Sequence, residues 1–271
     1  MHSLLDSLLP LWGICEHEGS SVIAAAFPYL LPGERYAGRN VSRYAVPRDY
    51  HAICGARLEK ACALLRDAFP GEAFHWHCDS TALPEVELAI KAGLGVRGKH
   101  NLLITEEYGT WVFLGEIISK TPHPLQEALD SARKPIMPVG IPPVGGRLQS
   151  NQGGSICDSC NACVRACPAG ALGEDGFDKT KCLSHITQRK GELSPEEFAL
   201  MRRAGTVWGC DLCQEACPRN RNAKVDPLPE FLREPIARVT QDSPIAGRAY
   251  AWRGEEVLLR NASQVNSAAQ P

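Results

Sequence analysis

The sequence has no run of about 18 consecutive apolar residues, which is the length that a membrane-spanning helix needs. Its first residues also lack the basic segment of a secretory signal peptide, and the apolar stretch at residues 8–14 is short and contains Pro10. Neither sign of charge is in excess, because 29 Lys and Arg stand against 31 Asp and Glu. We therefore expect a cytoplasmic protein with no membrane partner, in which any nucleic acid is held by a local patch rather than by net charge.

Cysteine is what the sequence contains in unusual number, since 12 of its 271 residues are cysteines. Eight of them lie between residues 157 and 217, and the other four are Cys15, Cys54, Cys62 and Cys78. A chain of this length is not one of the small secreted domains, usually under about 80 residues, that disulfides stabilise. The eight clustered thiols are therefore expected to bind metal or carry electrons, and the other four to pack as small apolar side chains.

The first 120 residues alternate between strand and helix patterns. Strands are predicted where short apolar or alternating runs occur, at residues 21–27, 74–78, 101–105 and 110–118. Helices are predicted where apolar residues recur at helical spacing, at residues 49–69 and 84–93. The last two strands are separated by four residues and are expected to form a hairpin. Gly93 to Gly98 spells GxGxxG, but it follows a predicted helix instead of a strand, so no dinucleotide site is expected.

Composition divides the chain into four consecutive parts, and the predicted fold class is α+β. These parts are an α/β domain at 1–119, a Pro/Gly-rich linker at 120–154, a cysteine-rich domain at 155–235 and a tail with a frayed end at 236–271. Within the third part, Ser194 and Glu197 have the spacing of a capping box and Gly205 is a good C-terminal cap, so a helix is predicted at 195–204. No internal repeat occurs beyond a duplicated cysteine motif.

That motif has the spacing of iron–sulfur ligands. Cys157-x2-Cys160-x2-Cys163-x3-Cys167-Pro168 is the bacterial ferredoxin run, in which three thiolates hold one cubane and the fourth reaches a second cluster. The second copy, Cys210-x2-Cys213-x3-Cys217-Pro218, is one cysteine short, and Cys182 fills that vacancy. The predicted ligands are Cys157, Cys160, Cys163 and Cys217 for one 4Fe-4S cluster and Cys167, Cys182, Cys210 and Cys213 for the other. Zinc held by four thiolates is the alternative, but it leaves the Cys-Pro endings unexplained.

Several short motifs between residues 49 and 220 occur together in a fixed order. They include Asp49-Tyr50-His51, Cys78-Asp79-Ser80, Gly93-Leu94-Gly95, Leu114-Gly115-Glu116, Cys182-Leu183-Ser184 and Gly209-Cys210-Asp211. In these motifs the chain resembles the epoxyqueuosine reductases. The resemblance implies an oxidoreductase that reduces epoxyqueuosine in tRNA to queuosine with cobalamin and two 4Fe-4S clusters. It also implies an N-terminal cobalamin-binding-type domain followed by a ferredoxin-like double-cluster domain.

The same resemblance assigns roles to individual residues. Asp79 becomes the proton donor, which requires a carboxyl whose pKa is raised, as burial against apolar groups would do. The residues that would contact cobalamin are Asp79, His100, Leu103, Leu114, Ser184 and Asp211. Electrons would come from an external donor such as flavodoxin or ferredoxin, and the chain is expected to be a monomer.

The chain looks short beside this family. Typical members have a longer N-terminal extension and a C-terminal helical-repeat domain that helps to grip tRNA. Residues 157–225 hold ten Lys and Arg against nine Asp and Glu, so no basic stripe compensates and tRNA binding is expected to be weakened. Two other functions stay open: a corrinoid and iron–sulfur reductase of a small organic substrate, and an iron–sulfur electron carrier without its own substrate.

Overall fold

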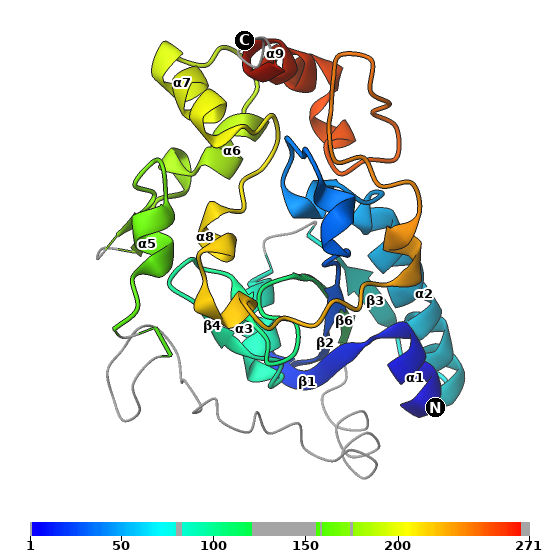
Figure 1. The fold of residues 1–271 in the computed structure, drawn as a ribbon. Helices are drawn as coiled ribbons and strands as arrows, with labels where there is room; N and C mark the ends of the chain where they lie inside the picture. The colour runs from blue at the N-terminus through cyan, green and yellow to red at the C-terminus, as the bar shows by residue number, and fades with distance from the viewer. Residues whose placement is uncertain (1, 80–82, 121–155, 158, 174–175, 267–271) are drawn as a thin grey trace. The chain divides into compact units, whose positions relative to one another are not determined.

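The computed structural model describes residues 2–79, 83–120, 156–157, 159–173 and 176–266 (Figure 1). The chain divides into two compact units that interleave along the sequence. The first unit contains Met1–Tyr29, His51–Gly98 and Leu102–Asp158, and the second contains Leu30–Tyr50, Lys99–Asn101 and Ser159–Pro271. The predicted linker lies outside the described residues except for Lys120. No helix within the described ranges combines the length and the apolar character that crossing a bilayer requires.

A four-stranded antiparallel sheet forms the centre of the first unit. Its strands, in the order β1-β2-β6-β3, are β1 (Leu11–His17), β2 (Ser20–Pro28), β6 (Val112–Ser119) and β3 (Phe74–His77). Glu18 and Gly19 join β1 to β2 with φ values of 51° and 74°, as a two-residue hairpin turn requires. In the register of the sheet, Glu116 of β6 lies between Ala24 of β2 and His77 of β3.

One helix covers each face of this sheet. On one face α2 (Tyr50–Ala68) approaches so closely that a Cβ on Gly115 would lie 2.7 Å from Leu58 Cδ1. On the other face α3 (Glu85–Lys91) is equally close, because a Cβ on Gly13 would lie 2.0 Å from Ala92 O. The core on the α3 face consists of Ala24, Ala26, Ala89, Leu94 and Leu103. These small and branched side chains let the C-terminal half of α3 pack against the sheet.

Most of the predicted elements are present, but two predictions for the first unit were wrong or incomplete. Residues 101–105 and 110–118 do not form a hairpin, because β5 (Leu103–Ile104) pairs with β4 (Val96–Arg97) while β6 pairs with β2 and β3. An apolar run shows that a strand is buried and does not show which strand lies beside it. In addition, α1 (His2–Leu8) and β1 were not predicted.

The four scattered cysteines are packed largely as expected. Cys54, Cys62 and Cys78 are buried, and Cys15 is half-buried. The Cys78 thiol donates to Leu114 O at 3.4 Å, so it helps to join β3 to β6. The GxGxxG run follows the end of α3 and contains β4, and Gly95 is required there because a Cβ would lie 2.2 Å from Ile104 O.

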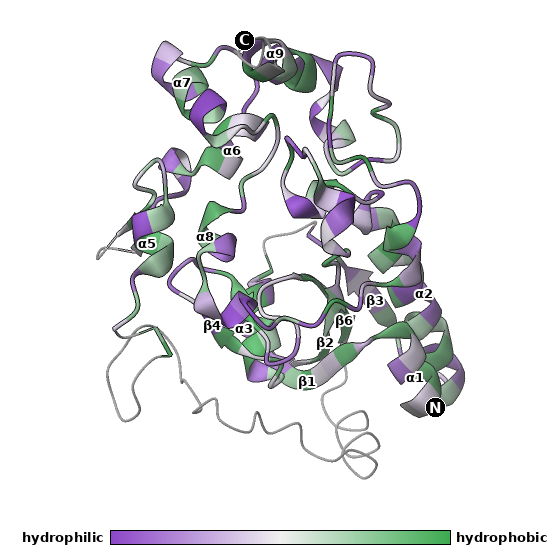
Figure 2. Cartoon of the chain, viewed as in Figure 1, coloured by the Kyte–Doolittle hydropathy of each residue, from purple (hydrophilic) through white to green (hydrophobic). Residues whose placement is uncertain are grey.

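The second unit is built from short helices and turns around Trp208, Tyr250 and Phe231, which are fully buried. Its helices are α5 (Ala162–Ala166), α6 (Leu183–Gln188), α7 (Pro195–Ala204), α8 (Leu212–Glu215) and α9 (Glu255–Asn266), and its strands are β7 (Leu172–Gly173) and β8 (Gly176–Phe177). The capping box of α7 is confirmed. Hydrophilic and hydrophobic residues alternate along α7 in Figure 2, as expected of a half-exposed helix.

The tail from residue 236 was expected to fray at its end, and through residue 266 this prediction was wrong. α9 buries Val257, Leu258 and Ala262. Asn261 Nδ2 donates to Thr187 O at 2.7 Å and to Val207 O at 2.8 Å. The helix is therefore fixed to the second unit by buried hydrogen bonds that its amino-acid composition does not reveal.

Residues 30–50 belong to the second unit, although the sequence placed them in a domain that spans 1–119. Ser42 N donates to Trp208 O and Val207 N donates to Asn40 O, both at 2.7 Å. The Asn40 side chain also exchanges two hydrogen bonds with the backbone of Val239, at 2.8 and 2.7 Å. Partners this distant in the sequence leave no local pattern, so the interleaving of the two units could not be predicted.

Candidate functional site

Seven of the eight clustered cysteines lie in the second unit, at the ends of its short helices. Cys163 is in α5 and Cys213 is in α8, and these two helices pack against each other. Cys182 is the N-cap of α6, and Cys217 precedes a turn that begins with Pro218. Cys157 belongs to the segment that ends the first unit. The two cysteine motifs therefore approach each other through their central helices.

Electrostatic interactions identify which thiols are neighbours. Burial raises the pKa of Cys210 to about 12, and nearby Asp211, Cys182 and Cys167 also disfavour its thiolate. Burial likewise raises the pKa of Cys213, with contributions from Cys210, Cys182 and, among others, Cys163. Buried thiolates that repel one another need a cation, and iron supplies it when a cluster binds. The soft sulfur ligands and their mutual proximity fit iron–sulfur clusters.

The electrostatic neighbours agree in part with the predicted ligand sets. Cys167, Cys182 and Cys210 belong to the set that the sequence assigns to one cluster, whereas Cys163, which also acts on Cys213, belongs to the other set. Within the described part of the chain, no three or more His, Cys, Asp or Glu side chains are grouped so that they could hold a single metal ion.

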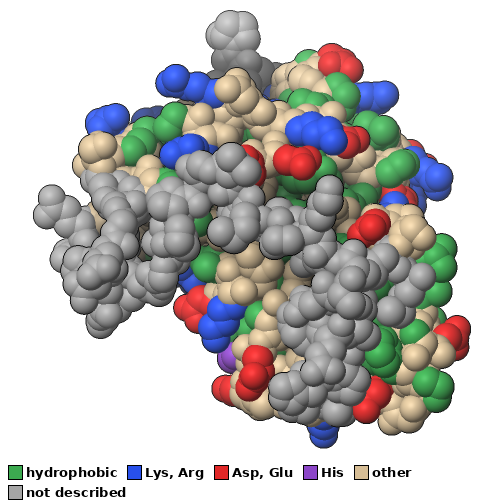
Figure 3. Space-filling model, turned by 90° about the horizontal axis from the view of Figure 1, so that it is seen from below, with side chains coloured by type: hydrophobic (Ala, Val, Ile, Leu, Met, Phe, Trp, Pro, Cys, Tyr) green, Lys and Arg blue, Asp and Glu red, His purple; other side chains and the backbone are tan. Residues whose placement is uncertain are grey.

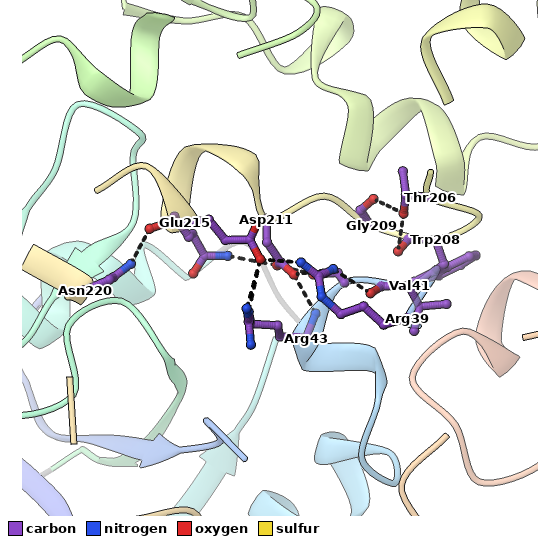
Figure 4. A network of polar contacts seen from close by, with 11 residues as sticks. Arg39, Val41, Arg43, Thr206, Trp208, Gly209, Asp211, Glu215 and Asn220 are labelled. Carbon is purple, nitrogen blue, oxygen red and sulfur yellow. Dashed lines mark hydrogen bonds and ion pairs between the residues drawn. The ribbon is translucent and has the colours of Figure 1, made fainter. Parts of the chain in front are cut away.

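Asp211, predicted to contact cobalamin, lies at the centre of a polar network (Figure 4). Its side chain is fully buried and forms an ion pair with Arg39 Nη1 at 3.3 Å. It also accepts hydrogen bonds from Ser42 Oγ, from Arg43 N at 2.7 Å and from Gln214 Nε2 at 3.4 Å. These donors occupy the acceptor capacity of the carboxylate. Asp211 therefore fixes the second cysteine motif to residues 39–43, and its carboxylate has no oxygen free for a ligand.

The other predicted cobalamin residues differ in accessibility. His100 is buried, and burial lowers its pKa to about 4, so its imidazole is neutral. Leu103 is a core residue of the first unit, whereas Leu114 is half-buried against that core. Ser184 is half-buried, and its hydroxyl accepts from Gln188 Nε2 at 3.3 Å. Of these side chains, Leu114 and Ser184 retain surface that a ligand can contact.

Asp79, the predicted proton donor, lies two residues after the end of β3. Its φ of 48° is left-handed, a conformation that aspartate tolerates better than most residues. The Asp79 backbone N–H donates to Glu85 Oε1 at 2.7 Å, and Asp79 Oδ2 lies 3.8 Å from His51 Nε2. The side chain is 61% exposed, so it lacks the burial that the sequence argument required of an acid.

Two glutamates beside Asp79 have the burial that Asp79 lacks. Burial raises the pKa of Glu85 to about 7, and the negative charge of Asp79 also contributes to this rise. Burial raises the pKa of Glu116 to about 9, and Glu85 and Asp79 add to this shift. Neither glutamate was predicted to have a role. The available signal was a single acidic residue within the apolar strand at 112–118.

Glu116 and Glu85 can hold protons near neutral pH, because burial raises the pKa of both carboxyls. Glu116 is fully buried on the α3 face, Glu85 begins α3, and Asp79 is exposed beside His51. The site can therefore act as an acid that donates protons to a substrate while that substrate is being reduced.

Comparison with known families identifies both regions. Residues 156–220 match the family described as "4Fe-4S double cluster binding domain", and residues 15–80 match the family described as "Epoxyqueuosine reductase QueG, DUF1730". The first match places the cysteine motifs in an iron–sulfur domain and favours iron over zinc as their metal.

Individual relatives agree with these matches. The epoxyqueuosine reductase of Listeria monocytogenes is 31% identical over 265 residues, which cover 91% of this chain and 63% of the relative. The epoxyqueuosine reductase of Shewanella oneidensis is 34% identical over 256 residues, which cover 89% of this chain and 58% of the relative. The solved structure of an epoxyqueuosine reductase with an epoxyqueuosine-modified tRNA stem loop has a TM-score of 0.69 at 25% identity, covering 91% of this chain and 63% of that chain.

The chain thus spans about three fifths of the length of these relatives. Over that shared part the two family matches, the sequence identity and the fold agree. The chain belongs to the epoxyqueuosine reductase family.

Proposed function

We propose that this chain reduces the epoxide of epoxyqueuosine in tRNA to the alkene of queuosine. The reaction consumes two electrons and two protons, breaks the two C–O bonds of the epoxide and releases its oxygen as water. The observation that carries the proposal is that a double 4Fe-4S domain and an acidic site at Asp79 occur in one chain of this family. The clusters conduct single electrons, and the acidic site provides protons.

The proposed cluster ligands follow the pairing that the sequence predicts. Cys157, Cys160, Cys163 and Cys217 hold one cluster, and Cys167, Cys182, Cys210 and Cys213 hold the other. The shared electrostatic environment of Cys210, Cys182 and Cys167 supports the second set.

Cobalamin is the proposed second cofactor. When bound, it supplies a strongly reducing cobalt centre for the two-electron step. The side chains of Leu114 and Ser184 are half-buried and leave surface for contact with it, whereas those of Leu103 and His100 are buried. The buried Asp211 carboxylate holds the cysteine loop, so any cobalamin contact of this residue involves its backbone. Asp79 holds the proton that the substrate receives.

The proposed macromolecular partner is tRNA, and the proposed electron donor is an external flavodoxin or ferredoxin acting on a monomer. The related enzyme solved with a modified tRNA stem loop supports the choice of RNA. On the face shown in Figure 3, basic and acidic side chains are interspersed and do not separate by sign. Affinity for tRNA is therefore expected to depend on a few local contacts, and to be weak beside that of a protein with a basic stripe.

Anaerobic reconstitution with iron, sulfide and cobalamin, followed by incubation with an epoxyqueuosine-containing tRNA stem loop and a reduced flavodoxin, tests the proposal. We expect mass spectrometry of the nucleoside to show loss of one oxygen atom. Asp79→Asn is expected to abolish this loss while both clusters remain bound. Cobalamin binding without tRNA turnover would favour a small-molecule corrinoid reductase. Electron delivery without cobalamin binding, unchanged in Asp79→Asn, would favour an electron carrier.

A further inference from the structure

Two acidic residues lie among the cysteines of the second motif. Asp211 follows Cys210, and Glu215 lies between Cys213 and Cys217. The Asp211 side chain is 0% exposed and that of Glu215 is 31% exposed, so water and salt screen their charges poorly. A 4Fe-4S cluster with four thiolate ligands is itself an anion, and reduction adds a further negative charge, so nearby carboxylates lower its reduction potential. The second motif therefore contains charges that oppose the arrival of an electron.

Two arginines from the segment at 39–43 compensate these carboxylates (Figure 4). Arg39 Nη1 lies 3.3 Å from Asp211 Oδ2, and Arg39 Nη2 forms an ion pair with Glu215 Oε1. Arg43 Nη2 lies 3.1 Å from the same Glu215 oxygen, and the Arg43 backbone N–H donates to Asp211 at 2.7 Å. The formal charges of these side chains cancel, and the sum becomes negative if either arginine is lost.

The network is close enough to the thiols of this motif to act on them. Asp211 is adjacent to Cys210 and is the N-cap of α8, the helix that contains Cys213. Burial raises the pKa of both thiols, and the nearby charge of Asp211 adds to each rise. A negative charge that disfavours a thiolate also disfavours an added electron, and the positive charge of Arg39 has the opposite effect.

Resting on the proposed cluster ligands, we propose that Arg39 and Arg43 raise the reduction potential of the cluster that Cys210 and Cys213 bind. Both arginines act through their charge, and neither is a ligand of the cluster. The step that they favour is the transfer of one electron, in which the external donor is oxidised and the cluster is reduced, with no bond made or broken. Their charge allows buried carboxylates to hold the cysteine loop without making the cluster too difficult to reduce.

Both arginines are fixed by further contacts, so their charges have defined positions. Arg39 Nη1 donates to Val41 O at 3.0 Å, and the Arg43 guanidinium lies 4.4 Å from the centroid of the Tyr36 ring. Burial raises the pKa of Asp211, whereas its hydrogen bonds and the charge of Arg39 favour the carboxylate. A charge that is already in position needs no reorganisation when the electron arrives. Its full effect is therefore exerted on the reduction potential.

Redox titration of the full chain with both clusters bound, followed by EPR, tests this role without any substrate. Cys182→Ser should lack the cluster in question and so identifies its midpoint potential. Arg39→Gln should make that cluster about tenfold less reduced at a given potential, which is a shift of about 59 mV to more negative values. Arg39→Lys keeps the charge and should shift the midpoint less. Glu215→Gln removes a negative charge and should shift the midpoint to more positive values.

The opposite signs separate an effect of charge from a loss of structure. Combining Arg39→Gln with Glu215→Gln should return the midpoint toward the wild-type value. Arg48→Gln is the matched control, because Arg48 and Glu234 form an ion pair that is 52% and 67% exposed and solvent screens it. Its midpoints should equal those of wild type.

Two results would overturn the role of the arginines. One is an unchanged midpoint in Arg39→Gln that retains its iron, and the other is a shift of the same sign in Arg39→Gln and Glu215→Gln. If Arg39→Gln loses iron, the sign of the shift in Glu215→Gln still decides. Wild-type protein that binds no cluster would overturn the proposed ligands and this role together. Absence of tRNA reduction by protein with both clusters would overturn the proposed function alone.

Discussion

The backbone N–H of Asp79 donates to the side chain of Glu85 at 2.7 Å, so the first residue of α3 holds the residue that follows β3. Asp79 needs this support because its φ of 48° is left-handed. The hydrogen bond places two carboxyl groups of different burial side by side. The exposed one, Asp79, can reach a ligand, and burial raises the pKa of the other, Glu85, to about 7.

Replacing Asp79 by Asn tests the proton donor with little change in shape. Asn tolerates a left-handed φ as well as Asp does, so unfolding free energy should change by less than about 0.5 kcal/mol. Turnover of epoxyqueuosine tRNA should fall on the order of 100-fold or more, because Asn cannot donate a proton at neutral pH. Iron content and the EPR spectrum should match wild type. Wild-type turnover in this variant would exclude Asp79 as the acid.

Glu116 should make the stability of the fold depend on pH. Its pKa rises from 4.5 to about 9 on folding, so between these values the folded chain keeps a proton that the unfolded chain has released. Stability then falls as pH rises through this window, by up to about 1.4 kcal/mol per pH unit. Urea unfolding at several pH values should show that the unfolding free energy of wild type falls with pH more steeply than that of Glu116→Gln. Parallel curves for the two proteins would mean that Glu116 ionises in the folded state.

Removing one cysteine should remove one cluster. Cys182→Ser is expected to lower bound iron from about eight to about four atoms per chain, because only the cluster that includes Cys210 and Cys213 loses a ligand. Cys54→Ser changes a buried thiol outside the motifs and is the control, with iron content unchanged. Iron analysis and EPR of protein reconstituted without oxygen provide the readout. Loss of both clusters together would contradict independent ligand sets.

Asp211 should contribute more to stability than an exposed ion pair does. Asp211→Ala leaves the Arg43 backbone N–H and Ser42 without their acceptor, and should cost about 3 kcal/mol in unfolding free energy. The pair of Arg48 and Glu234 is 52% and 67% exposed, so Arg48→Ala should cost no more than about 1 kcal/mol. Urea unfolding compares the two variants. Similar losses would show that the Asp211 network is not what holds residues 39–43.

Helices were predicted correctly from the sequence where all the groups that stabilise them lie within one short segment. The capping box of Ser194 and Glu197 predicted the start of α7 and Gly205 predicted its end, since every group that caps that helix is close in the sequence. The helix at 49–69 was predicted from apolar spacing alone and is α2. By contrast, β6 was paired with the wrong strand, because its partners in β2 and β3 are far away in the chain.

In the candidate site too, some features were predictable from the sequence and others depend on the tertiary structure. The spacing of eight cysteines by itself determined iron–sulfur chemistry, because thiolates that surround a cubane from one loop must recur at fixed short intervals. The acidic site was decided only by the tertiary structure. Glu116 lies on β6, Asp79 lies just after β3, and Glu85 begins α3, so these residues are far apart in the sequence. The pKa of a carboxyl depends on its burial and on neighbouring charges, neither of which a linear sequence records.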